Sequence, residues 1–219
     1  MKLKKHHKLV IAADGSAASG KTTGAKRIAK KYGMKFLSSG LLYRYASYKL
    51  LKNNPNNNIS FLKKCFKNLN LSKLNNQKLH LPEISAHTSV IAKQQKIRLI
   101  LKSFQKKFAK KYNKVVIEGR DIQTKILPNA DIKFFFKCSL DVAARRRFKE
   151  LKKKNKSTKL ADVKKAMRIR DYLDKKRKIS PLTQAKNAII VHSDKLNIKG
   201  MLVKMSKAIE EKIKEKYGN

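Results

Sequence analysis

Gly15 to Thr22 read GSAASGKT, and this stretch decides how the first part of the chain folds. An apolar run from Leu9 to Ala13 precedes it, and a segment of helix-forming composition follows it. A GxxxxGK[ST] string between a strand and a helix is typical of a P-loop, whose backbone N–H groups bind phosphate oxygens. The alternative is an ordinary glycine-containing turn, but the strand, loop, lysine, hydroxyl and helix together favour the P-loop.

Each position of this loop has an expected task. Gly15 and Gly20 are expected to adopt φ values that other residues resist, and a helix beginning near Lys21 directs its positive end at the phosphates. Lys21 is expected to contact the β- and γ-phosphates and Thr22 to ligate Mg²⁺. The expected ATP-binding residues are Gly15, Ser16, Ala17, Ala18, Ser19, Gly20, Lys21, Thr22 and Thr23.

The composition indicates one domain with a strongly basic surface. The chain has 219 residues, with 56 Lys and Arg against 14 Asp and Glu, for a formal charge of +42. A dedicated nucleic-acid surface concentrates its charge, whereas these lysines are spread along the chain together with many asparagines, as an AT-rich coding bias would also produce. We therefore expect a single domain over residues 1–219 that attracts anions and has no specific nucleic-acid partner.

Cysteine usage and hydropathy indicate a cytoplasmic protein. Cys65 and Cys138 lack the spacing of a metal site or a disulfide framework. The basic start, MKLKKHHK, precedes an apolar run too short for a signal peptide, and no stretch is long enough to span a membrane. His6 and His7 are expected to lie in a solvated N-terminal tail.

Four short apolar segments alternate with helical patterns: Leu9 to Ala13, Val115 to Ile117, Ile132 to Phe136 and Ala188 to Val191. This alternation predicts an α/β fold, a P-loop NTPase-type parallel sheet with helices on both faces. Ligands of such sheets bind beyond the carboxyl ends of the strands. Residues 45–112 are expected to form an insertion beside the core, and the basic stretch around 149–165 a lid over a triphosphate.

Two charged clusters follow predicted strands and helices. Glu118, Arg120 and Asp121 stand at the end of one strand, where Glu118 suits a Walker B carboxylate and Arg120 a phosphate ligand. The alternative there is a surface turn with a local pair between Arg120 and Asp121.

Further along the chain, Arg170, Asp174 and Arg177 share one face of a predicted helix. Two cations beside one carboxylate suit a ribose monophosphate, and intrahelical salt bridging is the alternative. A third cluster contains Ser38, Ser39 and Arg44, for which a helix N-cap serine is the simplest interpretation.

Taken together, the motifs resemble the bacterial cytidylate kinases, which transfer phosphate from ATP to CMP or dCMP. The resemblance runs from about Lys8 to the C-terminus. It rests on IAADGSAASGKTT at 11–23, SSGLLYR at 38–44, SVIAKQQKIR at 89–98, EGRDIQT at 118–124, ARRRFKEL at 144–151 and RDYLDKKRKISPL at 170–182. It implies a nucleoside monophosphate kinase that uses ATP with Mg²⁺ and acts as a monomer on small-molecule substrates.

The resemblance also implies a role for individual residues. Lys21, Arg120 and Arg177 would be catalytic, with Arg120 and Arg177 on the acceptor phosphate. Arg170 and Asp174 would hold the ribose, and Arg145 and Arg147 would reach from the lid to ATP. The remaining CMP-binding positions are Ser39 and Arg44 at the monophosphate, and Ser89, Arg98 and Asp121 at the cytosine edge, where a carboxylate accepts from N4 and arginine donates to N3 and O2.

Two departures from the family pattern concern the acceptor side. Ser38 replaces the usual Asp, which removes one carboxylate, and Gln123 replaces the usual Gly, so the backbone angles of that turn are expected to differ. Rival interpretations are a P-loop kinase for another small acceptor, such as UMP, AMP or shikimate, and a basic nucleic-acid-binding protein.

Overall fold

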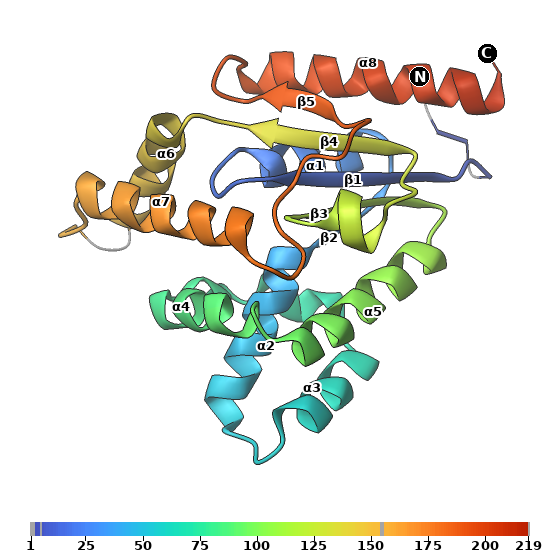
Figure 1. The fold of residues 1–219 in the computed structure, drawn as a ribbon. Helices are drawn as coiled ribbons and strands as arrows, with labels where there is room; N and C mark the ends of the chain where they lie inside the picture. Colours follow the sequence, from blue (N-terminus) through green and yellow to red (C-terminus); the bar gives the residue numbers. More distant parts are fainter. Residues whose placement is uncertain (1–2, 5, 154–155, 219) are drawn as a thin grey trace. The chain divides into compact units, whose positions relative to one another are not determined.

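The computed structural model describes residues 3–4, 6–153 and 156–218. It contains a five-stranded sheet with the order β2-β3-β1-β4-β5 (Figure 1). β1 pairs in parallel with β3 and β4, and β4 pairs in parallel with β5, which confirms the predicted α/β class. The strands are β1 (Leu9–Gly15), β2 (Lys35–Ser38), β3 (Lys114–Gly119), β4 (Ile132–Lys137) and β5 (Ile189–His192).

The strand register brings functional positions to one edge of the sheet. Ala13 lies opposite Glu118 on β3, and Gly15 lies opposite Phe136 on β4. Parallel strands end at the same edge, so the phosphate-binding loop and Glu118 emerge together. β2 was not predicted as a strand because Phe36 and Leu37 alone are too short an apolar run for that assignment.

The chain divides into two compact units. The first, which we call the core unit, comprises Met1–Phe36 and Asn113–Asn219. Its helices are α1 (Lys21–Lys31), α6 (Leu140–Lys152), α7 (Leu160–Lys176) and α8 (Ile198–Tyr217), and a π-helical turn, η3, covers Ile122–Ile126.

One face of the core unit's sheet packs against α1 and α8. Phe134 and Phe136 of β4, Ile28 of α1 and Met205 and Ile209 of α8 belong to one buried cluster and are all nearly inaccessible. Full burial of such a side chain contributes about 1.5–3 kcal/mol. This buried cluster packs around β1, from which the phosphate-binding loop continues.

The second unit, which we call the helical unit, comprises Leu37–Tyr112. The insertion expected over 45–112 falls within it. Tyr45, Phe66 and Phe104 stack edge to face in its core, with ring centroids 5.7 and 5.6 Å apart. Its elements are α2 (Ser39–Asn53), α3 (Asn58–Lys67), the short 3₁₀ turns η1 (Leu71–Asn75) and η2 (Gln77–His80), α4 (Pro82–Ile91) and α5 (Gln95–Lys111).

The segment expected as a lid, 149–165, contains the end of α6 and the start of α7. Lys154 and Asn155 of that segment lie outside the described residues.

Within the described ranges no helix combines the length and the apolar character needed to cross a membrane. Cys65 in the helical unit and Cys138 in the core unit are both free thiols.

The expectation that His7 lies in a solvated tail is wrong. His7 is 5% exposed, and its ring stacks on Tyr217 with the centroids 4.1 Å apart. The Tyr217 hydroxyl donates a hydrogen bond to the Lys8 carbonyl over 2.7 Å. The basic composition of the N-terminus gave no sign of this contact, because the aromatic partner comes from the other end of the chain.

Candidate active site

The phosphate-binding loop joins β1 directly to α1, which begins at Lys21 as expected. Gly20 has a φ of 76°, in the region that favours glycine, and Ala18 also has a positive φ, of 52°. Gly15 does not adopt a left-handed φ, so that expectation is wrong. Gly15 is required for another reason: a Cβ there would lie 2.6 Å from the Phe136 carbonyl oxygen.

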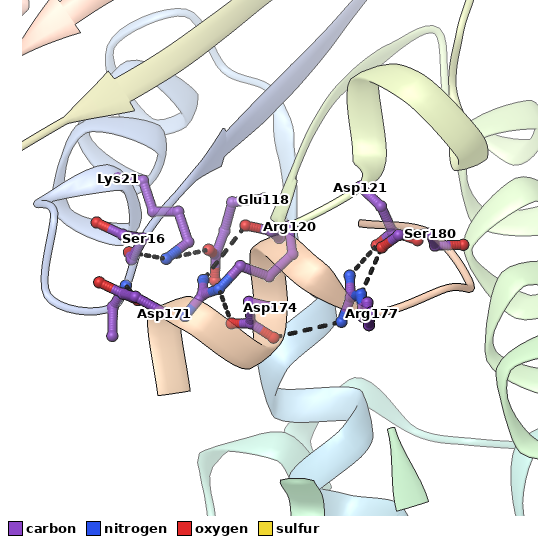
Figure 2. A network of polar contacts seen from close by, with 11 residues as sticks. Ser16, Lys21, Glu118, Arg120, Asp121, Asp171, Asp174, Arg177 and Ser180 are labelled. Carbon is purple, nitrogen blue, oxygen red and sulfur yellow. Dashed lines mark hydrogen bonds and ion pairs between the residues drawn. The ribbon is translucent and has the colours of Figure 1, made fainter. Parts of the chain in front are cut away.

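Lys21 is buried at the start of α1 and points back over the loop (Figure 2). Its Nζ donates to the Ser16 carbonyl over 3.1 Å and lies 3.9 Å from Oε2 of Glu118. Burial, with the nearby charge of Arg120 next in size, lowers the pKa of Lys21 to about 7, although Glu118 opposes the shift. Such a lysine gains its charge most readily when an anion comes close.

The strand-end cluster is not a surface turn with a local ion pair. Glu118 and Asp121 are 3% and 4% exposed. The Arg120 Nε donates to Oδ2 of Asp174, 2.9 Å away in α7, so its partner is distant in sequence (Figure 2). The alternative interpretation of this motif is therefore wrong.

Asp174 is the centre of the second cluster. It receives Arg120 on one carboxylate oxygen and Arg177 Nη1, at 3.4 Å, on the other. Burial opposes its ionisation, but Arg120 and Arg177 hold the pKa of Asp174 below its usual range. The prediction that Arg177 lies within the helix is wrong, because α7 ends at Lys176 and Arg177 is its extended C-cap residue. Its local pair with Asp174 is present, yet the shorter contact of Asp174 is with Arg120 after β3, so local salt bridging alone does not describe this site.

Arg177 and Arg170 complete the positive side of the site. Arg177 Nε donates to the Ser180 carbonyl, and Nη2 lies 3.9 Å from Oδ1 of Asp121 (Figure 2). The charge of Arg170 is close enough to affect the pKa values of both Lys21 and Asp174. The core unit thus brings the predicted residues Lys21, Arg120, Asp121, Arg170, Asp174 and Arg177 into one charged network.

Two residues of this network were not selected from the sequence. Asp171 of α7 accepts a hydrogen bond from the backbone N–H of Ala17, over 3.3 Å. Asp14, which is fully buried at the end of β1, accepts from the N–H groups of Ile122 and Gln123, over 3.0 and 2.8 Å. A lone carboxylate in an otherwise apolar strand is the sequence signal for Asp14, because a buried charge requires hydrogen-bond partners.

The three consecutive arginines of α6 differ in their contacts. Arg147 pairs on the surface with Glu150, at 2.9 Å, and Arg145 is exposed. The neighbouring Arg146 donates to the Ser193 carbonyl, over 2.6 Å, and to its hydroxyl, over 3.1 Å. A Cβ placed on Gly20 would lie 3.7 Å from Nη1 of Arg146, so this side chain stands at the phosphate-binding loop.

The helical unit holds the other predicted acceptor residues. Arg44 of α2 donates to the Leu79 carbonyl, over 2.8 Å, and to the Ser85 hydroxyl, over 2.7 Å. Arg98 of α5 is buried, donates to the Ala92 carbonyl over 3.1 Å and lies 5.7 Å from the ring centroid of Tyr43. Ser39 is the buried first residue of α2, and Ser89 is exposed on α4.

The departures at Ser38 and Gln123 have local structural explanations. The Ser38 hydroxyl accepts from the Leu41 N–H over 3.3 Å, so it is the N-cap of α2. Gln123 does not have a positive φ. The turn after β3 therefore does not need glycine for its backbone angles.

The donor groups around the loop fit a magnesium ion that is shared with a nucleotide. Among the described residues no three His, Cys, Asp or Glu side chains gather as a metal site. Mg²⁺ usually keeps several waters and takes one or two protein oxygens beside phosphate. The Thr22 hydroxyl, exposed on the first turn of α1, and the Glu118 carboxylate near Lys21 are oxygen ligands of that kind.

A phosphate-binding loop on a parallel sheet, with arginines gathered beside its lysine, defines a P-loop phosphotransferase. The sequence profile described as cytidylate kinase matches residues 11–211. The chain belongs to the cytidylate kinase family.

Relatives named cytidylate kinase match almost the whole chain. That of Clostridium botulinum (strain Okra) is 36% identical over 92% of this chain and 97% of its own. That of Clostridium tetani is 35% identical, over 96% and 98%. That of Thermosipho melanesiensis is 36% identical, over 93% and 98%.

Solved structures share the fold at lower identity. An uncharacterized protein from Eubacterium ventriosum superposes with a TM-score of 0.56 at 17% identity, over 93% of this chain and 99% of its own. A shikimate kinase from Bacteroides thetaiotaomicron gives a TM-score of 0.50 at 14% identity, over 92% and 98%. At these identities the likeness concerns the fold alone.

Proposed function

We propose that this chain transfers the γ-phosphate of ATP to CMP or dCMP, giving ADP and CDP or dCDP. The observation that carries the proposal is the contact set at Asp174, which holds Arg120 and Arg177 together beside the phosphate-binding loop. Family membership indicates the substrate class. The contacts of Asp174 place Arg120 and Arg177 where the phosphates of donor and acceptor would meet.

ATP would bind at the loop from Gly15 to Thr23, with backbone N–H groups and Lys21 on its phosphates. Arg145 and Arg147 were expected from the family resemblance to reach ATP from the lid, and we retain that role for a closed state of residues 149–165. Thr22 and Glu118 would hold Mg²⁺, directly or through its waters. The ion would supply neutralisation of the charge on the transferring phosphate.

CMP would take its phosphate contacts from Arg120 and Arg177, whose guanidinium groups match phosphate oxygens. Arg170 and Asp174 would hold the ribose, and Asp121 would accept from the cytosine amine. The helical unit would contribute the remaining acceptor contacts through Ser39, Arg44, Ser89 and Arg98.

The reaction requires positioning and charge stabilisation more than proton transfer. The attacking oxygen of a monophosphate is already anionic, so no side chain is assigned as a general base. Lys21, Arg120 and Arg177 would stabilise the negative charge that spreads over the transferring group. Asp174, by holding both arginines in place, reduces the motion needed to reach that arrangement.

The two free thiols suit a reducing compartment, and we place the reaction in the cytoplasm with the enzyme as a monomer.

A coupled assay of ADP release tests the proposal. ATP and Mg²⁺ are supplied with CMP, dCMP, UMP, AMP, GMP or shikimate, each at two salt concentrations. We expect CMP and dCMP to be preferred, and their ratio reports the consequence of Ser38 in place of Asp.

Other outcomes separate the rival functions. Preference for UMP, AMP or shikimate would replace the acceptor assignment and retain the phosphotransferase. Absence of turnover with every acceptor, together with steeply salt-dependent binding to RNA or duplex DNA, would favour a nucleic-acid-binding protein instead.

A further inference from the structure

Gln123 connects two parts of the core unit that lie far apart in the sequence. Its side chain is 1% exposed in the turn η3. Its backbone N–H donates to Asp14 over 2.8 Å, and its side-chain Oε1 accepts from the Ala185 N–H over 3.1 Å. The contact with Asp14 anchors Gln123 at the end of β1, and the contact with Ala185 reaches the chain between α7 and β5.

The Asp14 side of this connection is fixed by several donors. Burial raises the pKa of Asp14 to about 6, and the backbone N–H groups of Gln123 and Ile122 oppose that rise, as does the Gln123 side-chain amide to a smaller extent. The Nε2 of Gln123 makes no hydrogen bond of ordinary geometry with any described residue. It is therefore the backbone of Gln123, more than its amide, that secures the residue to Asp14.

Ala185, the other partner of Gln123, belongs to residues 178–188, which we call the return segment. This segment begins immediately after Arg177 and leads into β5. The Leu182 N–H donates to the Asp174 carbonyl over 2.8 Å, and the Leu182 side chain is 5% exposed. The Ser180 carbonyl accepts from Arg177 Nε. The return segment thus folds back on the last turn of α7 and orients the Arg177 guanidinium.

We propose that Gln123 is a positioning residue for the acceptor phosphate site, acting through the return segment on Arg177 and Asp174. This proposal rests on the proposed function. Oε1 of Gln123 holds the segment at Ala185, and Ser180 and Leu182 transmit that restraint to the end of α7. A glycine at this position would have no side chain that could accept from Ala185. The restraint is therefore a property of this chain's own residue.

A purely structural role for Gln123 makes a different prediction from a positioning role. A buried amide that only stabilises the fold would, when replaced, lower the melting temperature without distinguishing the two substrates. A positioning role affects the acceptor more than the donor, because Arg177 and Asp174 lie on the acceptor side of the proposed site. The KM values for CMP and ATP, measured separately, distinguish the two roles.

The test compares Gln123→Met, which keeps the side-chain length and removes the acceptor, with Gln105→Met. Gln105 is equally buried, at 1% exposed, and donates only within α5, to the Leu101 carbonyl, among the bonds described for it. For Gln123→Met we expect KM for CMP to rise about fivefold, the effect of losing one hydrogen bond. KM for ATP should stay within about twofold, and Gln105→Met should change neither KM value selectively.

Amide hydrogen exchange provides a readout that is independent of catalysis. In Gln123→Met the amides of Leu182 and Ala185 should exchange at least about tenfold faster than in the wild type, because the segment has lost its restraint. Ala185→Pro, which deletes the N–H donor from the other side of the same hydrogen bond, should reproduce the rise in KM for CMP. This second variant keeps the test decisive if Gln123→Met does not fold.

The proposal is overturned if a folded Gln123→Met variant shows unchanged exchange at Leu182 and Ala185. It is equally overturned if KM for CMP and KM for ATP rise together. If the wild type does not phosphorylate CMP, the proposed function fails, and faster exchange in Gln123→Met would then support only the restraint of the return segment and overturn its acceptor role.

Discussion

The carboxylate of Asp171 accepts a hydrogen bond from the backbone N–H of Ala17, over 3.3 Å. An acidic side chain of α7 is thus bound to a donor that a nucleotide phosphate would also use. Because like charges repel and the donor is shared, Asp171 and a phosphate oxygen compete for the same position. We therefore expect ATP binding to weaken the contact between α7 and the phosphate-binding loop.

Replacing Asp171 with Ala should tighten the binding of ADP in the absence of magnesium, by about three- to tenfold, because a freed N–H and a lost negative charge both favour phosphate. Calorimetry at two salt concentrations measures the change. Asp162→Ala, an exposed position in the first turn of the same helix, is the matched control and should bind ADP as the wild type does. Weaker binding by Asp171→Ala would contradict the competition.

Replacing Lys21 with Ala should lower kcat by about 100-fold or more, which is the usual cost of removing one preorganised electrostatic donor. The Lys21 ammonium lies 3.9 Å from the Glu118 carboxylate, and the loop has no neighbouring lysine to replace it. Lys26→Ala, an exposed position of the same helix, serves as the control. Turnover of Lys21→Ala within about threefold of the wild type would remove the lysine from the mechanism.

Nucleotide binding at pH 8 should be accompanied by proton uptake. The pKa of Lys21 is lowered to about 7, mainly by burial and next by Arg120, so the group is largely neutral at that pH. Phosphate favours the charged form and raises the pKa, so a proton is taken up on binding. Calorimetric titration of ADP in buffers of different ionisation enthalpy measures the uptake. It should vanish in Lys21→Met, and uptake that persists in that variant would assign the proton elsewhere.

Asp14→Asn should change how stability depends on pH. Because the pKa of Asp14 is raised to about 6, the folded state holds a proton that the unfolded state releases above pH 4, so this group's contribution to stability falls as pH rises to 6. The difference in unfolding free energy between wild type and variant should fall by roughly 3 kcal/mol across that window. Urea denaturation at several pH values measures it. A constant difference would show that Asp14 does not titrate there.

Arg146→Gln should raise KM for ATP by about tenfold, because Arg146 loses two hydrogen bonds to Ser193 at the edge of the phosphate-binding loop. Arg168→Gln, an exposed position of α7 with no assigned role, is the matched control and should change KM for ATP by less than about twofold. An unchanged KM for ATP in Arg146→Gln would show that Arg146 does not support ATP binding.

The fold was largely predictable because its signals are local. β1, β3, β4 and β5 are short apolar runs between polar turns, and β1 continues into the GSAASGKT loop. β2 was missed because its identity depends on its place in the sheet, which the two apolar residues Phe36 and Leu37 do not encode by themselves.

The limits of prediction at the site follow the same logic. The spacing of Arg170, Asp174 and Arg177 predicted one helix face, whereas α7 ends at Lys176 and Arg177 is its extended C-cap residue. No local pattern pairs Arg120 with Asp174 across 54 positions of sequence. The choice among the three consecutive arginines of α6 depends on the direction of each side chain, which requires the position of Ser193. The partner of Asp171 is a distant backbone N–H group that leaves no trace in the sequence. The lone carboxylate in apolar β1 indicates that Asp14 needs donors but does not identify them as Ile122 and Gln123.

The two cysteines offer a natural pair of labelling positions. Cys65 and Cys138 are partly accessible and belong to different units. Burial raises the pKa of the Cys65 thiol, so it will react with maleimide more slowly at neutral pH than an unperturbed thiol. Donor and acceptor fluorophores on these two sites would convert any displacement between the units into a change of energy-transfer efficiency, observable one molecule at a time during turnover.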